Sequence, residues 1–273
     1  MQPATTESAS YEDIHSATLA FYCDVLKTLN NTSLPYLIGG GYAFHLYTKI
    51  NRQTKDFDLF IDRADFDRFS RVLSEAGYNV ELTYPHWLAK VHFNGDVIDL
   101  VFGSGNGVAE VDKAWFDYAA PADLFGIPTK ICPAEEMLWS KAYIMERERF
   151  DGADIAHLIL ARGQQLDWSR LLRRFDPHWR LLLSHLTLFG LIYPAHRDVV
   201  PRWIMNELLD RLNEELDSPS QDYKICGGTL LSREQYLDDI HQWGYQDARL
   251  VPLGNLTRQE TASWTEAIKK KEK

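Results

Sequence analysis

The chain of 273 residues has only three cysteines, Cys23, Cys132 and Cys226, and they lie far apart. This scarcity argues against a disulfide framework and a zinc site, and it favours the reducing cytoplasm as the location. No apolar run approaches the roughly 18 residues that a membrane span needs. Residues 1–15 have neither a basic start nor an apolar stretch, so we expect no secretory signal and no membrane association.

Positive charge is also scarce, because 29 lysines and arginines face 39 aspartates and glutamates, for a formal net charge of −10. Such an acidic chain argues against a broad nucleic-acid-binding surface, although net charge leaves a local basic patch open. The rest of the composition is ordinary, with 45% hydrophobic and 25% charged residues. These proportions are typical of a globular protein with enough apolar material for a sizeable core.

A turn of three consecutive glycines, residues 39–41, is the first feature that points to chemistry. It follows a short apolar strand, expected over 36–38, and precedes a helix expected over 42–49. Glycines let backbone N–H groups at a helix start approach a phosphate closely. A dinucleotide fingerprint would need a small residue where Phe44 stands, and the Gly-Lys-Ser/Thr of a P-loop is absent. On its own the turn is weak support for a phosphate site.

Two aspartates, Asp56 and Asp58, lie two residues apart on the next predicted strand, residues 55–61. Successive side chains of a strand alternate between its faces, so both carboxylates project together while Phe57 and Leu59 point the other way. Neighbouring carboxylates repel each other, and a cation between them relieves that repulsion. The alternative is an exposed edge strand whose solvated aspartates prevent aggregation.

A third aspartate, Asp99, lies in an apolar strand predicted over 97–102. Asn94-Gly95 is a two-residue hairpin signal, so this strand should run antiparallel to the preceding one, residues 89–93. A lone aspartate in so apolar a strand needs a partner or a cation, because burying an unpaired charge is costly. If this strand lies beside that of the first two aspartates, three carboxylates converge, and such oxygen ligands suit Mg²⁺ or Mn²⁺.

The pattern of apolar residues and turns predicts an α+β part followed by a mostly helical part. We expect a disordered N-terminus over 1–10, an α+β domain over 11–130, a helical domain over 131–218 and a C-terminal extension with a frayed basic tail over 219–273. Further helices are expected over 11–28, 64–76, 134–149, 153–162, 168–175, 180–189, 201–216 and 234–243, and a further strand over 78–82. The chain has no long linker, so we expect the two parts to pack together with the active cleft between them.

The glycine turn, the short helix and the run Arg52-x-Thr54-x-Asp56-Phe57-Asp58, with Asp99 on a later strand, resemble the DNA polymerase β-like nucleotidyltransferase superfamily. The resemblance covers roughly residues 34–160. It is greatest to the small bacterial branch that includes type IV toxin–antitoxin nucleotidyltransferases and minimal nucleotidyltransferases. It implies a nucleotidyltransferase-like mixed sheet flanked by helices and followed by a mostly helical domain.

The resemblance implies transfer of a nucleoside monophosphate from a nucleoside triphosphate, with ATP as the first expectation, to an acceptor hydroxyl with release of pyrophosphate. Asp56 and Asp58 would bind Mg²⁺ or Mn²⁺, and Asp99 would be a ligand and the general base. The implied nucleotide-binding residues are Gly39, Gly40, Gly41, Arg52, Thr54 and Lys141. The family's glycine pair is either the first and second glycine or the second and third, and the alanine at position 43 favours the latter.

A second partial match lies over 141–155, which resembles the family's order of Lys, Arg and Asp-x-x-Asp. Lys141 would then point at phosphate, with an arginine nearby. The family often has a lysine directly before the first aspartate, whereas this chain has Phe150 there, so the roles of Asp151 and Asp154 stay open. The alternative for Lys141 is an ordinary solvated helical lysine.

Several alternatives stay open at this point. The acceptor is a small molecule such as an aminoglycoside, a tRNA end or a protein side chain, and the acidic charge mildly disfavours tRNA. Arg52 is either a phosphate contact or an exposed loop residue. The protein is either an enzyme or a catalytically silent relative, which would act as a binding module or as a toxin–antitoxin component with a partner protein. Metal-dependent turnover of a nucleoside triphosphate separates these two classes.

Overall fold

The computed structural model describes residues 14–51, 56–219 and 224–271, with side chains described as far as residue 266. Contacts divide the chain into two compact units. Unit 1 comprises residues up to 104 together with residues 110–133, and unit 2 comprises residues 105–109 together with residues from 134 onward. The disorder predicted over 1–10 falls outside the described residues.

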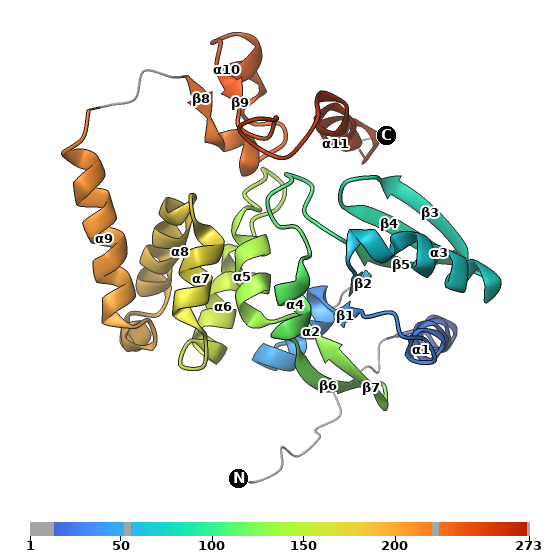
Figure 1. The fold of residues 1–273 in the computed structure, drawn as a ribbon. Helices are drawn as coiled ribbons and strands as arrows, with labels where there is room; N and C mark the ends of the chain where they lie inside the picture. Colours follow the sequence, from blue (N-terminus) through green and yellow to red (C-terminus); the bar gives the residue numbers. More distant parts are fainter. Residues whose placement is uncertain (1–13, 52–55, 220–223, 272–273) are drawn as a thin grey trace. The chain divides into compact units, whose positions relative to one another are not determined.

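Unit 1 is built around a mixed sheet, and Figure 1 shows its strands. In spatial order these are β3 (Asn79–Tyr84), β4 (Leu88–Phe93), β5 (Asp96–Val101), β2 (Phe57–Phe60), β1 (Leu37–Ile38), β7 (Ile127–Ile131) and β6 (Ala120–Leu124). The pairs β2–β5 and β1–β7 are parallel, and the other neighbours are antiparallel. The predicted α+β class, a mixed sheet flanked by helices, is confirmed.

The helices of unit 1 form where apolar residues recur at helical spacing. They are α1 (Ser16–Asn30), α2 (Gly40–Thr48), the 3₁₀ turn η1 (Arg63–Asp65), α3 (Phe66–Glu75) and α4 (Lys113–Asp117). In α3 the buried stripe is Phe66, Phe69 and Leu73. Gly77, with φ +94°, follows the end of this helix, where a residue with a Cβ would be strained.

The hairpin between β4 and β5 fixes how the third aspartate is paired. Asn94 and Gly95 have φ of +50° and +92°, which is the conformation that a two-residue hairpin turn of this kind requires. The antiparallel pairing predicted from this dipeptide is confirmed, with Phe93 opposite Asp96 at the turn. The register from this turn gives each residue of β4 a defined partner on β5, and the partner of Asp99 is Lys90.

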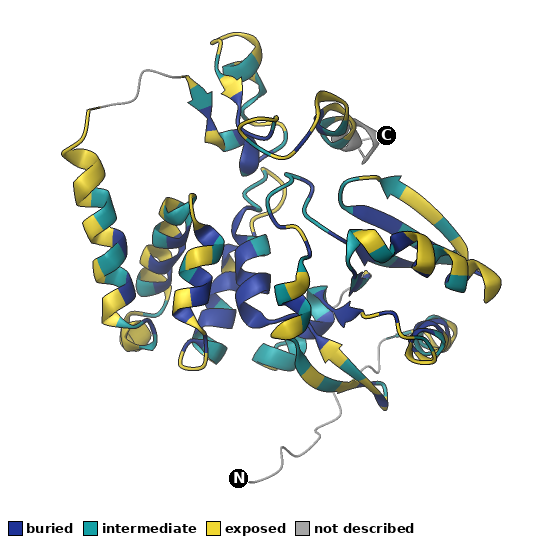
Figure 2. Ribbon diagram, in the orientation of Figure 1, coloured by how far each residue is buried: buried dark blue, intermediate teal, exposed yellow. Residues whose placement is uncertain are grey.

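Unit 2 is mostly helical. Its first part contains α5 (Ala134–Ala142), α6 (Gly152–Arg162), α7 (Trp168–Phe175), α8 (Trp179–Ile192), the 3₁₀ segment η2 (Pro194–Val199) and α9 (Arg202–Leu216). Figure 2 shows α5 buried along most of its length, and this helix contacts α6, α7 and α8. The carboxylate of Glu136 on α5 is fully buried and pairs with Arg170 and Arg174. Such pairing satisfies a charge that would otherwise be costly to bury.

The second part of unit 2 is the C-terminal segment, defined here as residues 224–266. It contains β8 (Ile225–Cys226), the 3₁₀ turn η3 (Gly227–Leu230), α10 (Leu237–His241), β9 (Gln246–Asp247) and most of α11 (Arg258–Lys271), whose backbone includes the terminal lysine run. This segment holds the loop of residues 105–109. Asn106 Nδ2 donates to Leu230 O at 2.7 Å, and Asn255 Nδ2 donates to Gly107 O at 2.9 Å.

Several parts of the chain differ from the sequence prediction: α4, α11 and the β8–β9 pair were not predicted, and the helix expected over 234–243 is shorter. The helix expected over 134–149 ends at Ala142, and the chain then makes a tight turn in which Glu146 N donates to Arg149 O at 2.8 Å. The β6–β7 hairpin was not predicted. Its turn residues Phe125 and Gly126 both have positive φ, at +56° and +74°.

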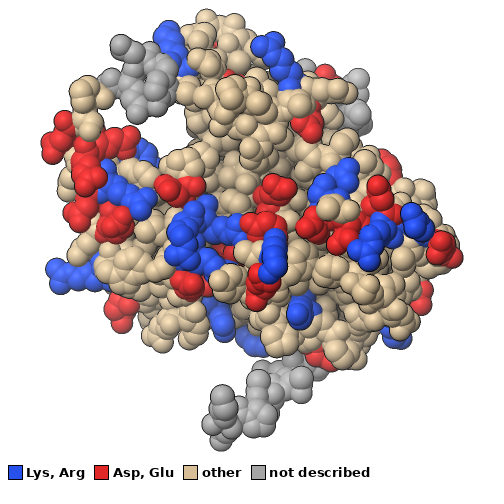
Figure 3. All heavy atoms as spheres, in the orientation of Figure 1, with Lys and Arg blue, Asp and Glu red and all other residues tan. Residues whose placement is uncertain are grey.

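The surface charge agrees with an acidic chain that carries no broad basic face on the side in view. In Figure 3 basic and acidic side chains are interspersed over the visible surface. Among the helices of the described residues, none combines the length and the apolar character needed to cross a bilayer.

Candidate active site

Asp58 and Asp99 face each other across two parallel strands. The register of β2 and β5 pairs Asp58 with Asp99 directly, between the pairs Phe57–Ile98 and Leu59–Leu100. Side chains of directly opposite residues lie on the same face of a sheet, with Cβ atoms roughly 5 Å apart. The predicted condition, that the strand of Asp99 lies beside that of the earlier aspartates, is therefore confirmed.

Burial explains why these carboxylates face away from the core. Phe57 and Leu59 on β2 are completely buried, so the residue between them, Asp58, points to the opposite face and is partly exposed. Asp56 directly precedes β2 and is exposed. The alternation of apolar and acidic residues expected for this strand is the one observed.

The glycine turn brings the start of α2 against the Asp58 carboxylate. Gly39 N donates to Asp58 O at 3.0 Å, and a Cβ built on Gly39 would lie 2.1 Å from the Phe60 ring. Gly40 has φ +52°, and its Cβ would lie 1.8 Å from Asp58 Oδ2. Both positions therefore require glycine. Because the backbone approaches a carboxylate here, a phosphate reaching this turn needs a cation to offset the repulsion.

Lys90 on β4 forms an ion pair with Asp99, the aspartate that faces Asp58. The antiparallel register places Lys90 opposite Asp99, and Lys90 Nζ lies 2.6 Å from Asp99 Oδ1. The Lys90 side chain is 30% exposed and that of Asp99 is 17% exposed, so solvent screens the pair only in part. The face of the sheet thus carries Asp58, Asp99 and Lys90 on three consecutive strands.

The surroundings of Asp99 make it a better proton acceptor than an ordinary aspartate. Burial is the main cause that raises its pKa, and the nearby charge of Asp56 raises the pKa further. The Lys90 ammonium opposes this by hydrogen bonding and by its charge, and the net direction is upward. Asp99 is therefore disposed to accept a proton, provided that Lys90 leaves room for the donor.

The negative field of the site also acts on Tyr22 of α1. Its pKa is raised to about 12, first by burial and then by the charges of Asp96, Asp56, Asp58 and Asp99. The effect of four carboxylates on one phenol indicates an excess of negative charge at this part of the sheet. A divalent cation bound there would lower that excess.

The donor chemistry of Asp56, Asp58 and Asp99 fits a hard divalent cation, because carboxylate oxygens are the ligands that Mg²⁺ and Mn²⁺ prefer. Within the described residues, no three His, Cys, Asp or Glu side chains are already gathered in a form that would hold an ion. Asp99 Oδ1 is engaged by Lys90 instead. The donor types suit such an ion, and to bind one through Oδ1 the Asp99 side chain would have to give up its contact with Lys90.

The remaining predicted residues are distributed between the two units. Gly41 lies in the first turn of α2. Arg52 and Thr54 lie outside the described residues, so their predicted phosphate contacts stay predictions. Lys141 lies on α5 of unit 2, whereas Asp58 and its neighbours belong to unit 1.

Lys141 is held by two carboxylates of its own unit. Its Nζ lies 2.8 Å from Asp151 Oδ2 and 2.8 Å from Asp154 Oδ2, and Arg149 forms two further hydrogen bonds with Asp151. Burial alone would raise the pKa of Asp151, but Arg149 and Lys141 hold it below its usual value. The Lys, Arg and Asp-x-x-Asp pattern thus forms a compact ion-pair cluster, and the alternative of a solvated Lys141 is wrong.

Lys90 was not predicted as a site residue, although the sequence carries a signal for it. A two-residue turn at Asn94-Gly95 pairs the flanking residues symmetrically, so the fourth residue before the turn faces the fourth residue after it. These residues are Lys90 and Asp99, as the observed register shows. The ion pair could therefore have been predicted from the turn and the strand pattern alone.

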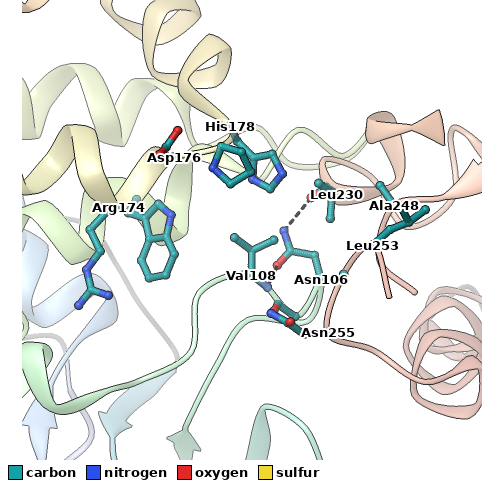
Figure 4. Close-up of a pocket in the computed structure, with 13 residues that line it drawn as sticks. Asn106, Val108, Arg174, Asp176, His178, Leu230, Ala248, Leu253 and Asn255 are labelled. Carbon is teal, nitrogen blue, oxygen red and sulfur yellow. Dashed lines mark hydrogen bonds between the residues drawn. The ribbon is translucent and has the colours of Figure 1, made fainter. Parts of the chain in front are cut away.

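Unit 2 has a pocket of its own, shown in Figure 4. Its volume is about 290 Å³, and its lining includes the loop of residues 106–108, Trp139, the turn between α7 and α8, and part of the C-terminal segment. Two polar side chains of the lining have hydrogen-bond partners: His178 Nδ1 lies 2.8 Å from Tyr143 Oη, and Asn106 Nδ2 donates to Leu230 O. Burial lowers the pKa of His178, which favours its neutral form.

Comparison with known proteins gives one family match. The sequence model of a family described as "Uncharacterised nucleotidyltransferase" matches residues 22–192, which is more than half of the chain. Among curated proteins, none matches the chain.

Solved structures to which this chain is similar include an antibiotic-resistance factor, a lincosamide antibiotic adenylyltransferase and a protein from Helicobacter pylori. The antibiotic-resistance factor ANT(2'')-Ia is 18% identical over 63% of this chain and 98% of its own, with a TM-score of 0.44. The lincosamide antibiotic adenylyltransferase LnuA, with lincomycin bound, is 14% identical over 53% of this chain and 96% of its own, with a TM-score of 0.36. JHP933 from Helicobacter pylori is 10% identical over 74% and 98% of the two chains, with a TM-score of 0.36.

Proposed function

Because the chain belongs to the family of uncharacterised nucleotidyltransferases, we propose that it transfers a nucleoside monophosphate from a nucleoside triphosphate to an acceptor hydroxyl, in a reaction that depends on Mg²⁺ or Mn²⁺. The observation that carries this proposal is the direct pairing of Asp58 with Asp99 beneath a glycine turn that only glycine can form. Two carboxylates held side by side at a helix start favour a site for a cation and a phosphate.

The three carboxylates share one role in the proposed reaction, and Asp99 has a second. Asp56, Asp58 and Asp99 would hold the metal, which when bound neutralises charge on the phosphates and on the leaving pyrophosphate. Asp99 accepts the proton of the acceptor hydroxyl, whose oxygen forms a bond to the α-phosphorus as the bond to the β-phosphate oxygen breaks. The upward shift in the pKa of Asp99 suits this role as a base.

The nucleotide would be ATP in the first instance. Backbone N–H groups of Gly39, Gly40 and Gly41 would approach its phosphates, and Arg52 and Thr54 would contact them. Lys141 would reach phosphate only by giving up its bonds to Asp151 and Asp154; it is therefore the least favoured member of this set.

The acceptor class is the open part of the proposal. A small molecule, a tRNA end and a protein side chain all supply the hydroxyl that the chemistry requires, and a toxin–antitoxin partner would be a protein acceptor or a bound regulator. We place the reaction in the cytoplasm, to which Cys23, Cys132 and Cys226 are suited because they form no disulfide.

The test is calorimetric titration of a non-hydrolysable ATP analogue, with and without Mg²⁺, into wild type and Asp58→Asn. Asp67→Asn is the matched control, because Asp67 is an exposed aspartate in the first turn of α3 and the charge change is the same. We expect metal-dependent binding to wild type and to Asp67→Asn, and loss of that binding in Asp58→Asn.

The opposite results have clear meanings. Failure of folded wild type to bind any of the four nucleoside triphosphates would reject the enzyme and leave the catalytically silent binding module. Equal binding by Asp58→Asn and wild type would show that the nucleotide binds away from the paired aspartates. A positive result would justify a screen of acceptors with the radiolabelled nucleotide.

A further inference from the structure

Lys90 lies between two carboxylates on the open face of the sheet. Its strand β4 is flanked by β5 and β3, and the registers place Asp99 opposite it on one side and Glu81 opposite it on the other. Lys90 Nζ is bonded to Asp99 Oδ1 at 2.6 Å. Glu81, 58% exposed, lies 3.4 Å from His92 Nε2. Lys90 therefore has one partner in the candidate active site and a second acidic neighbour outside it.

The Lys90 ammonium places positive charge directly beside one of the paired aspartates, Asp99. Asp58 and Asp99 are direct neighbours, and the charge of Asp56 acts on Asp99. Without a cation, these carboxylates would repel one another across the sheet. The contact from Lys90 offsets part of that repulsion and fixes one oxygen of Asp99.

We propose that Lys90 is a positioning residue that acts as an internal stand-in for the metal ion. It holds Asp99 in place while no ion is bound, and it moves toward Glu81 when Asp99 turns to a divalent cation. The affinity of the site for metal is then set by competition with Lys90. This inference rests on the proposed function, because it takes the three aspartates as the metal site.

The competition predicts opposite effects for two substitutions on neighbouring strands. Removing the charge of Lys90 frees Asp99 and deepens the negative potential, so Lys90→Met should bind a divalent ion more tightly. Glu81→Gln removes the position to which Lys90 retreats, so Lys90 stays on Asp99 and the ion should bind more weakly. A lysine with a merely structural role gives no reason for effects of opposite sign.

The experiment is titration of the purified full chain with Mn²⁺ at pH 8, with free Mn²⁺ measured by electron paramagnetic resonance. We expect the dissociation constant of Lys90→Met to fall by about tenfold, as for the removal of one opposing charge beside a carboxylate. Lys90→Arg keeps the charge and should remain within about twofold of wild type. Lys130→Met is the matched control, since Lys130 is an exposed lysine on β7 of the same sheet; it should not change the affinity.

The rise in Tm on adding Mg²⁺ is a second readout, and Lys90→Gln is a second neutral variant in case Lys90→Met folds poorly. If wild type and both neutral variants bind Mn²⁺ with equal affinity, the inference is overturned while the metal site stands. If none of them binds Mn²⁺, the metal site and this inference both fail. Tighter binding by the neutral variants together with weaker binding by Glu81→Gln supports the competition.

Discussion

Replacement of Gly40 by alanine is the sharpest test of how the glycine turn serves the paired aspartates. Gly40 has φ +52°, and an added Cβ would lie 1.8 Å from Asp58 Oδ2. A real Cβ keeps at least 3.0 Å from such an atom, so the Asp58 carboxylate would have to move by about 1 Å or more. Gly40→Ala therefore combines backbone strain with displacement of a site residue.

The two contributions can be separated with a matched control. Gly77 has φ +94°, and a Cβ there would meet nothing within 4 Å. Alanine at Gly77 should cost about 1–2 kcal/mol, which is the cost of a positive φ for a residue with a Cβ. Gly40→Ala should cost the same amount plus about 1–2 kcal/mol for disturbing the Asp58 carboxylate and its hydrogen bonds.

The assay is urea unfolding followed by circular dichroism, for both single variants, for Asp58→Ala and for the double variant Gly40→Ala/Asp58→Ala. Because Asp58→Ala removes the clashing oxygen, the two substitutions should be non-additive by about 1 kcal/mol or more. Equal losses of stability for Gly40→Ala and Gly77→Ala, with additive behaviour of the double variant, would refute the argument.

Three further predictions concern unit 2. Glu136→Gln should lower the free energy of unfolding by about 3–5 kcal/mol, because the buried Arg170 charge loses one of its carboxylate partners. Urea titration measures this loss, and a value below about 1 kcal/mol would contradict the importance of the pair. Burial lowers the pKa of His185 below 6.5, so on acidification the unfolded chain takes up a proton at this residue before the folded chain does. The free energy of unfolding is therefore unaffected by protonation of this residue above pH 6.5 and falls below it. The Tm of wild type should therefore drop more steeply than that of His185→Gln between pH 7.5 and 5, and parallel curves would contradict the assignment. Asn106→Ala, which removes the 2.7 Å bond to Leu230 O, should speed hydrogen exchange over 105–109 and 227–231, and unchanged exchange would show that this contact does not hold the loop.

The strands that carry the aspartates could be predicted because their local signals agree with the fold. Phe57 and Leu59 alternate with acidic residues, and Asn94-Gly95 gives a hairpin with a defined register. The choice of β5 as the neighbour of β2 could not be predicted in this way. Parallel pairing between distant segments is decided by packing of the whole sheet, and the sequence alone supplied only a condition for it.

The β6–β7 hairpin was not predicted because each of its strands contains a proline. Pro121 and Pro128 lie within the two strands, and a proline in an apolar run normally argues against a strand. Phe125 in the turn has a positive φ, which is uncommon for a bulky residue, so the residue type does not predict the turn.

The helix predicted over 134–149 was too long for a different reason. Residues 145–149, Met-Glu-Arg-Glu-Arg, have good helix propensity, but this preference is weak beside tertiary contacts. The turn there brings Arg149 and Asp151 together and allows both Asp151 and Asp154 to bind Lys141. Ion pairs among residues 141–154 thus outweigh the local preference for a continuous helix.

The loop of residues 105–109 has a consequence for how the polypeptide acquires its structure. The chain leaves unit 1 after Ser104, returns at Glu110 and leaves again after Pro133, so it crosses between the units three times. During synthesis, the loop that follows the strand of Asp99 emerges long before Leu230 and Asn255, the residues that hold it. The strand of Asp99 is therefore synthesised well before the contacts that hold the loop of residues 105–109, which form only when residues 224–266 have been made. A ribosome-bound or proteolytically shortened chain that ends before residue 224 would carry the three aspartates and yet lack the residues that hold this loop.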